Sequence, residues 1–433
     1  MKIFSPAISR LARLRYWRIE HWVKDPVAAQ REVLQDLITH GQYTQIGRRY
    51  QFSTIFNIRK FKELVPIQAY EDLKPYIDEV MQGEPDVLWN TPIEWFAKSS
   101  GTTSDKSKFI PLSQESIEDN HFQGSKDVLS IYYNALPESD LLTGKMLVIG
   151  GSHQVHPIKD DIQYGDLSAV LLQNSPIWSG LVRVPELSIA LMDEWESKIE
   201  MLAQSTIQEP VTSIAGVPTW TMVLLKRILQ ITGKKTIKEV WPDFELYIHG
   251  GVSFTPYRAE FKKIIGGDCN YLEIYNASEG FFAAQDRLDE EGMLLFLDHG
   301  IFYEFMPVEE SGKENPLTIG LDKVEIGKNY AIVISTNGGL WRYLVGDTVQ
   351  FVTLNPFRIK VSGRLKQYIN AFGEELIADN SDKAISETCT SFNVVMKEYT
   401  AAPIYMSDNG SGAHEWLIEF EIAPTDMHAF AVA

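Results

Sequence analysis

The feature that most constrains this chain is the alternation of short β-rich runs with longer helical stretches between about residues 90 and 365. The β-rich runs lie at 146–149, 245–248, 271–275, 293–297 and 330–335, and the helical stretches lie at 114–135, 188–204, 218–231 and 255–265. This alternation is typical of an α/β domain with buried sheets. Several closely spaced strands follow residue 293 with few helices between them, which predicts an antiparallel or barrel-like part as well.

Chain length and a change of texture near residue 363 predict two domains. At 433 residues the chain exceeds a usual single core, so we expect a large domain over 1–362 and a small one over 379–433. The polar residues 363–378 include two glycines, and we interpret them as a hinge. A helical stretch and a strand predict an α+β class for the C-terminal domain. It is shorter than a typical domain, so we expect it to be incomplete, with a compact natural domain as the alternative.

Composition argues against several function classes. A net charge of −18 is unfavourable for broad nucleic-acid binding, which requires a basic surface. No run approaches about eighteen consecutive apolar residues, and arginines interrupt the N-terminal segment, so we expect neither a membrane span nor a signal peptide. Cys269 and Cys389 are the two cysteines of the sequence, which suits a reducing cytosol, and we predict a cytoplasmic protein.

The most informative segment is rich in glycine and small hydroxyl residues, and it runs from Lys98 to Pro111 as KSSGTTSDKSKFIP. Backbone N–H groups of such a loop can approach phosphate oxygens, and the hydroxyl groups add donors. Lys106 and Lys108 could supply positive charge. The segment does not match the Walker pattern G-x-x-x-x-G-K-[ST]. Taken alone, it is more often a polar surface turn than a phosphate site.

Two later segments carry carboxylates next to predicted strands. Glu279 follows a strand within YNASEG and could hold Mg²⁺, which prefers one or two carboxylates together with phosphate oxygens. Tyr275 of the same segment could stack on a base. Asp347 in YLVGD could accept hydrogen bonds from both hydroxyls of a ribose. The alternatives are a turn with a solvated glutamate and a hairpin turn capped by an aspartate.

The residues 363–373 could act as more than a linker. Arg364 or Lys366 could reach a bound nucleotide if the stretch is a hinge. An ordinary connection between domains is the alternative.

The order and spacing of these segments are more specific than any one of them. Together they resemble the adenylate-forming superfamily of acyl-CoA ligases, nonribosomal adenylation domains and luciferases. More narrowly, they resemble the Gretchen Hagen family, the auxin-responsive acyl acid amido synthetases of plants and their bacterial relatives. The resemblance is carried by AKSSGTTSDKSKFIPLS (97–113), HGGVSFTPYR (249–258), IYNASEGFFAAQ (274–285), YLVGDTV (343–349) and GRLKQYINAFGEEL (363–376).

The resemblance implies a large adenylate-forming domain and a role for each matching residue. The family's phosphate loop matches Ser99, Ser100, Gly101, Thr102 and Thr103. Its adenine and metal region matches Tyr275, Ser278 and Glu279, its ribose-binding aspartate matches Asp347, and its hinge lysine matches Lys366. The family often has arginine after the tyrosine of the Tyr-x-x-Gly-Asp motif. Here that position is Leu344, and Arg342 precedes the tyrosine, so the arginine contact of the family is in doubt.

The implied reaction uses ATP and Mg²⁺ to convert a small carboxylic acid into its acyl-adenylate and then transfers the acyl group to an amine, expected to be an amino acid. We expect an apolar pocket for the acid. Val217, Trp220 and Phe281 are candidates to line it, although core packing is the commoner role of such residues. Two alternatives remain: an acyl-CoA ligase with coenzyme A as acceptor, and a noncatalytic nucleotide-binding regulatory protein.

Overall fold

The computed structural model describes residues 5–99, 107–151, 155–159, 161–192, 194–365, 378–404 and 413–432. Ser100, Gly101, Thr102 and Thr103 of the phosphate loop and Lys366 of the hinge lie outside these ranges, so the roles predicted for them stand as predictions. Within the described ranges, no helix has both the length and the apolar character needed to cross a membrane.

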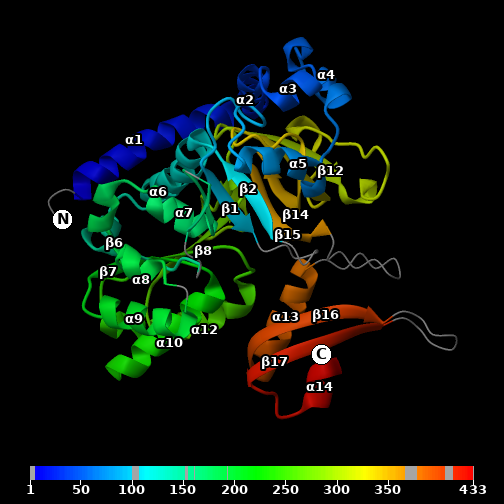
Figure 1. The fold of residues 1–433 in the computed structure, drawn as a ribbon. Coiled ribbons are helices and arrows are strands. Elements are labelled where there is room, and N and C mark those ends of the chain that lie inside the picture. The colour runs from blue at the N-terminus through cyan, green and yellow to red at the C-terminus, as the bar shows by residue number, and fades with distance from the viewer. Residues whose placement is uncertain are drawn as a thin grey trace.

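A large central sheet has two differently built halves (Figure 1). Parallel pairing joins β3 (Lys145–Val148), β6 (Arg183–Val184), β7 (Val211–Ala215), β8 (Leu246–His249) and β9 (Asn270–Ala277). Antiparallel pairing joins β10 (Gly280–Ala284), β11 (Met293–Leu295), β12 (Ile301–Pro307), β13 (Asn329–Thr336), β14 (Tyr343–Leu354) and β15 (Phe357–Arg364). In the described residues the strand order is β12-β13-β14-β15-β11-β10-β9-β8-β7-β3-β6. The α/β class is confirmed, and the strands expected after residue 293 continue the same sheet.

A smaller sheet carries the two ends of the predicted phosphate loop. Its strand order is β2-β1-β5-β4, with bounds β1 (Trp95–Ser99), β2 (Lys108–Leu112), β4 (His156–Lys159) and β5 (Ile162–Gly165). β1 and β2 pair antiparallel, and Ser99 lies opposite Lys108. The chain therefore leaves and re-enters this sheet at one point, which fixes both ends of the segment between them.

Helices surround the sheets, and most of them precede or separate the strands of the parallel half. Those in the described ranges are α1 (Ser5–Lys24), α2 (Pro26–Gly41), α3 (Gln45–Arg49), α4 (Ile58–Leu64), α5 (Tyr70–Met81), α6 (Gln123–Ala135), α7 (Leu167–Gln173), α8 (Leu187–Ala190), α9 (Trp195–Thr206), α10 (Pro218–Thr232), α11 (Ile237–Val240), α12 (Arg258–Ile265), α13 (Ala378–Phe392) and α14 (Met427–Val432). Local chemistry sets their ends: α10 has proline at its first position and ends at Gly233, whose φ of 65° favours glycine.

Two hydrophobic clusters cover the two faces of the parallel half. One cluster joins α9, α10 and α12 to β7 and β8, with Leu202, Leu224 and Phe261 buried in it. The larger cluster contains α6 and the antiparallel strands, and α1 lies along α6 (Figure 1). An ion pair between Arg15 of α1 and the buried Asp127 of α6 fixes that helix in place. The sheet is therefore buried on both faces, as its continuous apolar strands require.

Residues 378–404 and 413–432 form an α+β unit below the large sheet (Figure 1). β16 (Val395–Ile404) and β17 (Ala413–Ile422) pair antiparallel beside α13 and α14. Phe430 packs on Phe392 and Phe420, with ring centroids 5.6 and 5.4 Å apart. Lys226 of α10 pairs with Glu421 at 2.6 Å, which links this unit to the large domain. The α+β class is as expected, while the domain boundaries at 362 and 379 stay predictions.

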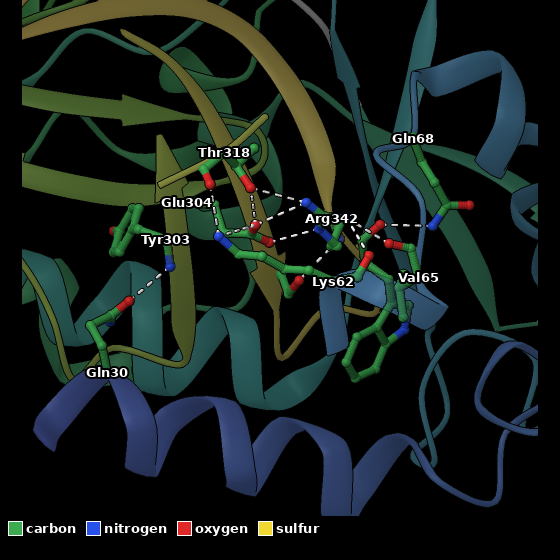
Figure 2. A network of polar contacts seen from close by, with 10 residues as sticks. Gln30, Lys62, Val65, Gln68, Tyr303, Glu304, Thr318 and Arg342 are labelled. Atoms are coloured by element: carbon green, nitrogen blue, oxygen red, sulfur yellow. Dashed lines mark hydrogen bonds and ion pairs between the residues drawn. The ribbon is translucent and has the colours of Figure 1, made fainter. Parts of the chain in front are cut away.

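A buried ion pair fixes the start of β14 (Figure 2). Arg342, just before the strand, is 5% exposed and has a left-handed backbone with φ of 44°. Its guanidinium donates to both carboxylate oxygens of Glu304, at 2.8 and 2.9 Å, and to the carbonyl of Val65 at 2.6 Å. Lys62 lies 3.3 Å from the same carboxylate. The arginine that departs from the family pattern therefore stabilises the fold.

Removing the negative charge from this network should destabilise the protein strongly. Glu304→Gln leaves the buried guanidinium of Arg342 without its counter-ion, so we expect the free energy of unfolding to fall by about 3 kcal/mol. The matched control is Glu290→Gln, which breaks a half-exposed pair with Arg287 and should cost less than about 1 kcal/mol. Urea unfolding measures both, and equal losses would contradict a special role for the buried pair.

Candidate functional site

The carboxyl ends of the parallel strands meet at one edge of the large sheet, and glycines directly follow two of them. β7 continues into Gly216 and β8 into Gly250 and Gly251. A Cβ on Gly250 would lie 2.4 Å from the carbonyl oxygen of Ile274, so only glycine permits this approach of β8 and β9. Ligands of α/β sheets bind at this kind of edge. The fold therefore predicts the site here.

The turn between β9 and β10 carries the predicted metal ligand to this edge. Ala277 and Gly280 pair across the hairpin, so Ser278 and Glu279 are the two residues of its turn. Both are half-buried. The buried amide of Asn120 holds the strand that follows, since its oxygen accepts the N–H of Phe281 at 2.7 Å. Glu279 therefore projects from a tightly fixed turn.

Asp347 and Tyr275 meet at the same edge, although 72 residues separate them. Tyr275 of β9 donates its hydroxyl to Asp347 Oδ2 at 2.8 Å, and Arg364 Nε at the end of β15 lies 3.2 Å from Asp347 Oδ1. Burial raises the pKa of Asp347, while Arg364 and the tyrosine hydrogen bond lower it. Burial also raises the pKa of Tyr275 well above its usual value, so this phenol stays a neutral donor. The pair fixes a carboxylate beside the strand ends.

Glu279 and Lys108 both contact a third residue, Tyr343, which lies between them. The ammonium of Lys108 lies 3.5 Å from the Tyr343 hydroxyl, which donates to Glu279 Oε1 at 3.4 Å. Lys108 also lies over the rings of Tyr70 and Tyr343, 5.6 and 6.0 Å from their centroids. Since Lys108 is the first residue of β2, the strand that follows the predicted phosphate loop begins close to the metal-ligand candidate Glu279.

The environment of Glu279 is unusual for a carboxyl group. Burial raises its pKa to about 7; the charge of Asp347 acts in the same direction, and Lys108 and Arg364 act against it. Titratable groups with raised pKa values cluster at functional sites. In the described residues, no group of three or more His, Cys, Asp and Glu side chains could form a metal cage. Glu279 with Asp347 nearby instead fits Mg²⁺ bound mainly to phosphate oxygens.

The three predicted acid-binding residues lie in different places. Val217 precedes α10 as its N-cap at the strand-end edge, and a Cβ on Gly251 would lie 3.5 Å from its side chain. Trp220 is 36% exposed on the surface of α10, against Trp195 of α9. Phe281 is buried and stacks on Phe296, so it has the core role that we considered as the alternative.

Sequence reasoning missed two tyrosines of the site. Tyr343 was part of the quoted Tyr-x-x-Gly-Asp motif, but nothing local indicated that its hydroxyl would face Glu279. Tyr70 of α5 carried no signal, because its contact with Lys108 depends on how α5 packs beside β2. Ser99 is half-buried and is the last residue of β1, and its predicted part in the phosphate loop stays a prediction.

The raised pKa of Glu279 predicts a pH-dependent stability. In the unfolded chain this carboxyl titrates near 4.5 and in the folded one near 7, so the ionised group disfavours folding as pH rises between these values. Glu279→Gln removes this effect. We expect the variant to match the wild type near pH 4.5 and to exceed its free energy of unfolding by roughly 3 kcal/mol at pH 8.

Urea unfolding of the ligand-free protein across this pH range measures the difference. Glu290→Gln, at an exposed carboxylate, is the control and should leave the pH dependence of the wild type unchanged. A constant difference between Glu279→Gln and wild type at all pH values would contradict the raised pKa.

Comparison with known proteins identifies two family domains in the chain. Residues 15–269 match the GH3 family N-terminal domain, and residues 294–364 match the GH3 family central domain. An indole-3-acetic acid-amido synthetase of Arabidopsis thaliana is 21% identical over 399 residues, which are 77% of this chain and 72% of that protein. A jasmonoyl-L-amino acid synthetase of Nicotiana attenuata is 25% identical over 393 residues, 76% of this chain and 67% of that protein.

Solved structures share the fold. An acyl acid amido synthetase in complex with 2,4-DB superposes with a TM-score of 0.80 at 18% identity, covering 97% of this chain and 82% of that one. A 2-hydroxyisobutyryl-CoA ligase in complex with its acyl-AMP superposes with a TM-score of 0.57 at 12% identity, covering 85% and 74%. At these identities the likeness concerns the fold.

Proposed function

The chain belongs to the GH3 family and is a ligase, and we propose that it is an acyl acid amido synthetase that depends on ATP and Mg²⁺. It would adenylate a small carboxylic acid, release pyrophosphate, and transfer the acyl group to an amino acid. The observation that supports this most directly is the convergence of Glu279, Asp347 and Lys108 at the carboxyl edge of the parallel strands. These side chains come from β14, from β2 and from the β9–β10 turn, and they supply two carboxylates and a cation.

The first step overcomes the low reactivity of a carboxylate towards nucleophiles. An oxygen of the acid attacks the α-phosphorus of ATP, the bond from that phosphorus to the bridging oxygen of pyrophosphate breaks, and an acyl-AMP anhydride forms. This step requires positioning and charge stabilisation more than proton transfer. Mg²⁺, when bound, would neutralise charge on the departing pyrophosphate.

Each residue would hold one part of the nucleotide. Asp347, fixed by Tyr275, would accept hydrogen bonds from the ribose hydroxyls. Glu279 would be the protein ligand of the metal, and Lys108 would bind phosphate oxygens together with Ser99 and the loop residues Ser100 to Thr103. Lys366 would reach the reacting phosphate from the hinge.

In the second step an amine attacks the acyl carbon, the bond from that carbon to the AMP oxygen breaks, and the amine nitrogen loses a proton. The choice of an amino acid as acceptor follows the relatives, among them a 4-substituted benzoates-glutamate ligase of Arabidopsis thaliana. We propose that Val217 and Trp220, at the start of α10, line the binding pocket for the carboxylic acid. Phe281 contributes no exposed ring there.

The proposal predicts AMP and pyrophosphate from ATP in the presence of Mg²⁺ and an acceptable acid. A panel of aryl and alkyl carboxylic acids, with and without amino acids or coenzyme A, would identify both substrates by chromatography. Glu279→Ala should lower acid-dependent pyrophosphate release by about 100-fold or more, because the metal loses its protein ligand. Glu290→Ala, at an exposed carboxylate, should have no effect.

Three results would contradict parts of this proposal. ADP instead of AMP would exclude adenylation. ATP binding without turnover of any acid would favour a regulatory protein. Thioester formation with coenzyme A, in place of an amide, would make the chain an acyl-CoA ligase.

A second prediction concerns Asp347. Asp347→Asn keeps an acceptor for Tyr275 but removes the charge that holds the ribose, so the KM for ATP should rise about tenfold. Comparison with 2′-deoxy-ATP makes the test specific: the wild type should prefer ATP, and the variant should lose most of that preference. Asp289→Asn, at an exposed aspartate, is the control, and an undiminished preference in Asp347→Asn would contradict the ribose contact.

A further inference from the structure

Two opposite charges of the site contact the same neutral hydroxyl. Lys108 Nζ lies 3.5 Å from Tyr343 Oη, and Glu279 Oε1 lies 3.4 Å from it on the other side. The Tyr343 hydroxyl therefore lies between the ammonium of Lys108 and the carboxylate of Glu279. Both distances are at the long end of hydrogen bonds, so either contact can be exchanged readily for a ligand.

The hydroxyl between the charges is more firmly held than the charges themselves. Tyr343 is fully buried at the first position of β14, where it pairs with Ile334 of β13. On its other side Gln68 brackets it, donating its N–H to the Arg342 carbonyl and accepting the N–H of Leu344, each at 2.9 Å. Arg342, the residue before Tyr343, is held by the hydrogen bonds of its guanidinium group (Figure 2). Tyr343 therefore has little freedom to follow either partner.

The charged groups have more freedom. Lys108 ends in a flexible four-carbon chain, and its ammonium contacts tyrosine rings in place of a carboxylate. Glu279 is half-buried at the β9–β10 turn, whereas Tyr343 is fully buried, so the glutamate side chain is less enclosed than the phenol. Without an intervening group, these side chains would form a direct ion pair. Such a pair would occupy the carboxylate needed by the metal and the ammonium needed by the phosphates.

We propose that Tyr343 is a positioning residue that keeps Lys108 and Glu279 apart, so that both remain available to the triphosphate and its metal ion. This inference rests on the proposed function, because it takes Mg²⁺ and ATP as the ligands. The phenol donates to Glu279 and accepts from Lys108, which compensates each charge weakly in the ligand-free site. When Mg²⁺ and the triphosphate bind, stronger partners replace both contacts and no ion pair has to break.

Tyr343→Phe tests the inference, because it keeps the ring and removes the hydroxyl. Isothermal titration calorimetry with ATP, in excess Mg²⁺ and in EDTA, measures how much Mg²⁺ tightens binding. We expect the Kd for ATP in Mg²⁺ to rise about tenfold and the tightening by Mg²⁺ to shrink by a similar factor. Tyr303→Phe is the matched control, since Tyr303 is equally buried and its hydroxyl has no hydrogen-bond partner in the described residues. It should bind Mg²⁺ and ATP as the wild type does.

A double-mutant cycle distinguishes the proposed role of Tyr343, which is to keep Lys108 and Glu279 apart, from a general structural effect of the substitution. If Tyr343 acts by keeping Lys108 from Glu279, then Tyr343→Phe should have little further effect on the Mg²⁺ tightening in a Lys108→Met background. The same loss in both backgrounds, or wild-type affinity in Tyr343→Phe, would overturn the inference. Thermal unfolding should show all variants folded at the temperature of the titration.

The outcome is distinguishable from failure of the proposed function. Binding of Mg²⁺ and ATP by the wild type without AMP formation would refute the synthetase, and the comparison of Tyr343→Phe with the wild type would still decide the spacing role. Failure of the wild type to bind ATP in Mg²⁺ would overturn both.

Discussion

The two halves of the large sheet meet at the β9–β10 hairpin, and the position of this hairpin depends on one buried amide. Asn120 accepts the N–H of Phe281 and donates to the carbonyls of Phe281 and His299, at 3.4 and 3.0 Å. A buried amide with these partners has a single favourable orientation. It holds the turn that carries Glu279 at the boundary between the parallel and antiparallel strands. The site could not form if that boundary moved, because its residues come from both halves.

The carboxylates of the scaffold and the carboxylate of Glu279 at the site differ in how closely a partner group contacts them. Glu304 and Asp286 are buried against the guanidinium groups of Arg342 and Arg358, with hydrogen bonds of 2.7 to 2.9 Å. The negative charge of each of these carboxylates is therefore balanced by an arginine that donates two hydrogen bonds to it. Glu279 instead meets a phenol at 3.4 Å, and burial raises its pKa to about 7. A buried carboxylate without a close cationic partner lowers the stability of the fold. The same carboxylate can bind a metal cation favourably, as a metal site requires.

Local pattern predicted a large share of this molecule. The alternation of β-rich and helical segments indicated an α/β domain, and the strands after residue 293 were expected to form an antiparallel or barrel-like part. These elements are clearly patterned, and the burial of the sheet on both faces leaves a strong signal in the sequence. The spacing of the motifs pointed to the family to which the chain belongs. It also indicated Asp347, Tyr275 and Glu279, which the fold brings to one edge of the sheet.

What the pattern left open depended on contacts between distant segments. Phe281 lies two residues after Glu279 in the chain, but Glu279 is in the β9–β10 turn whereas Phe281 is in β10, and the ring of Phe281 packs in the core. Arg342 was a doubtful nucleotide contact until its left-handed backbone and its pair with Glu304 showed a structural role. The position of Tyr343 between Lys108 and Glu279 joins three segments that lie up to 235 residues apart. Residue types and local periodicity determine which elements form and which chemistry they carry; which side chains meet is decided only when those elements pack, because a contact depends on both partners at once.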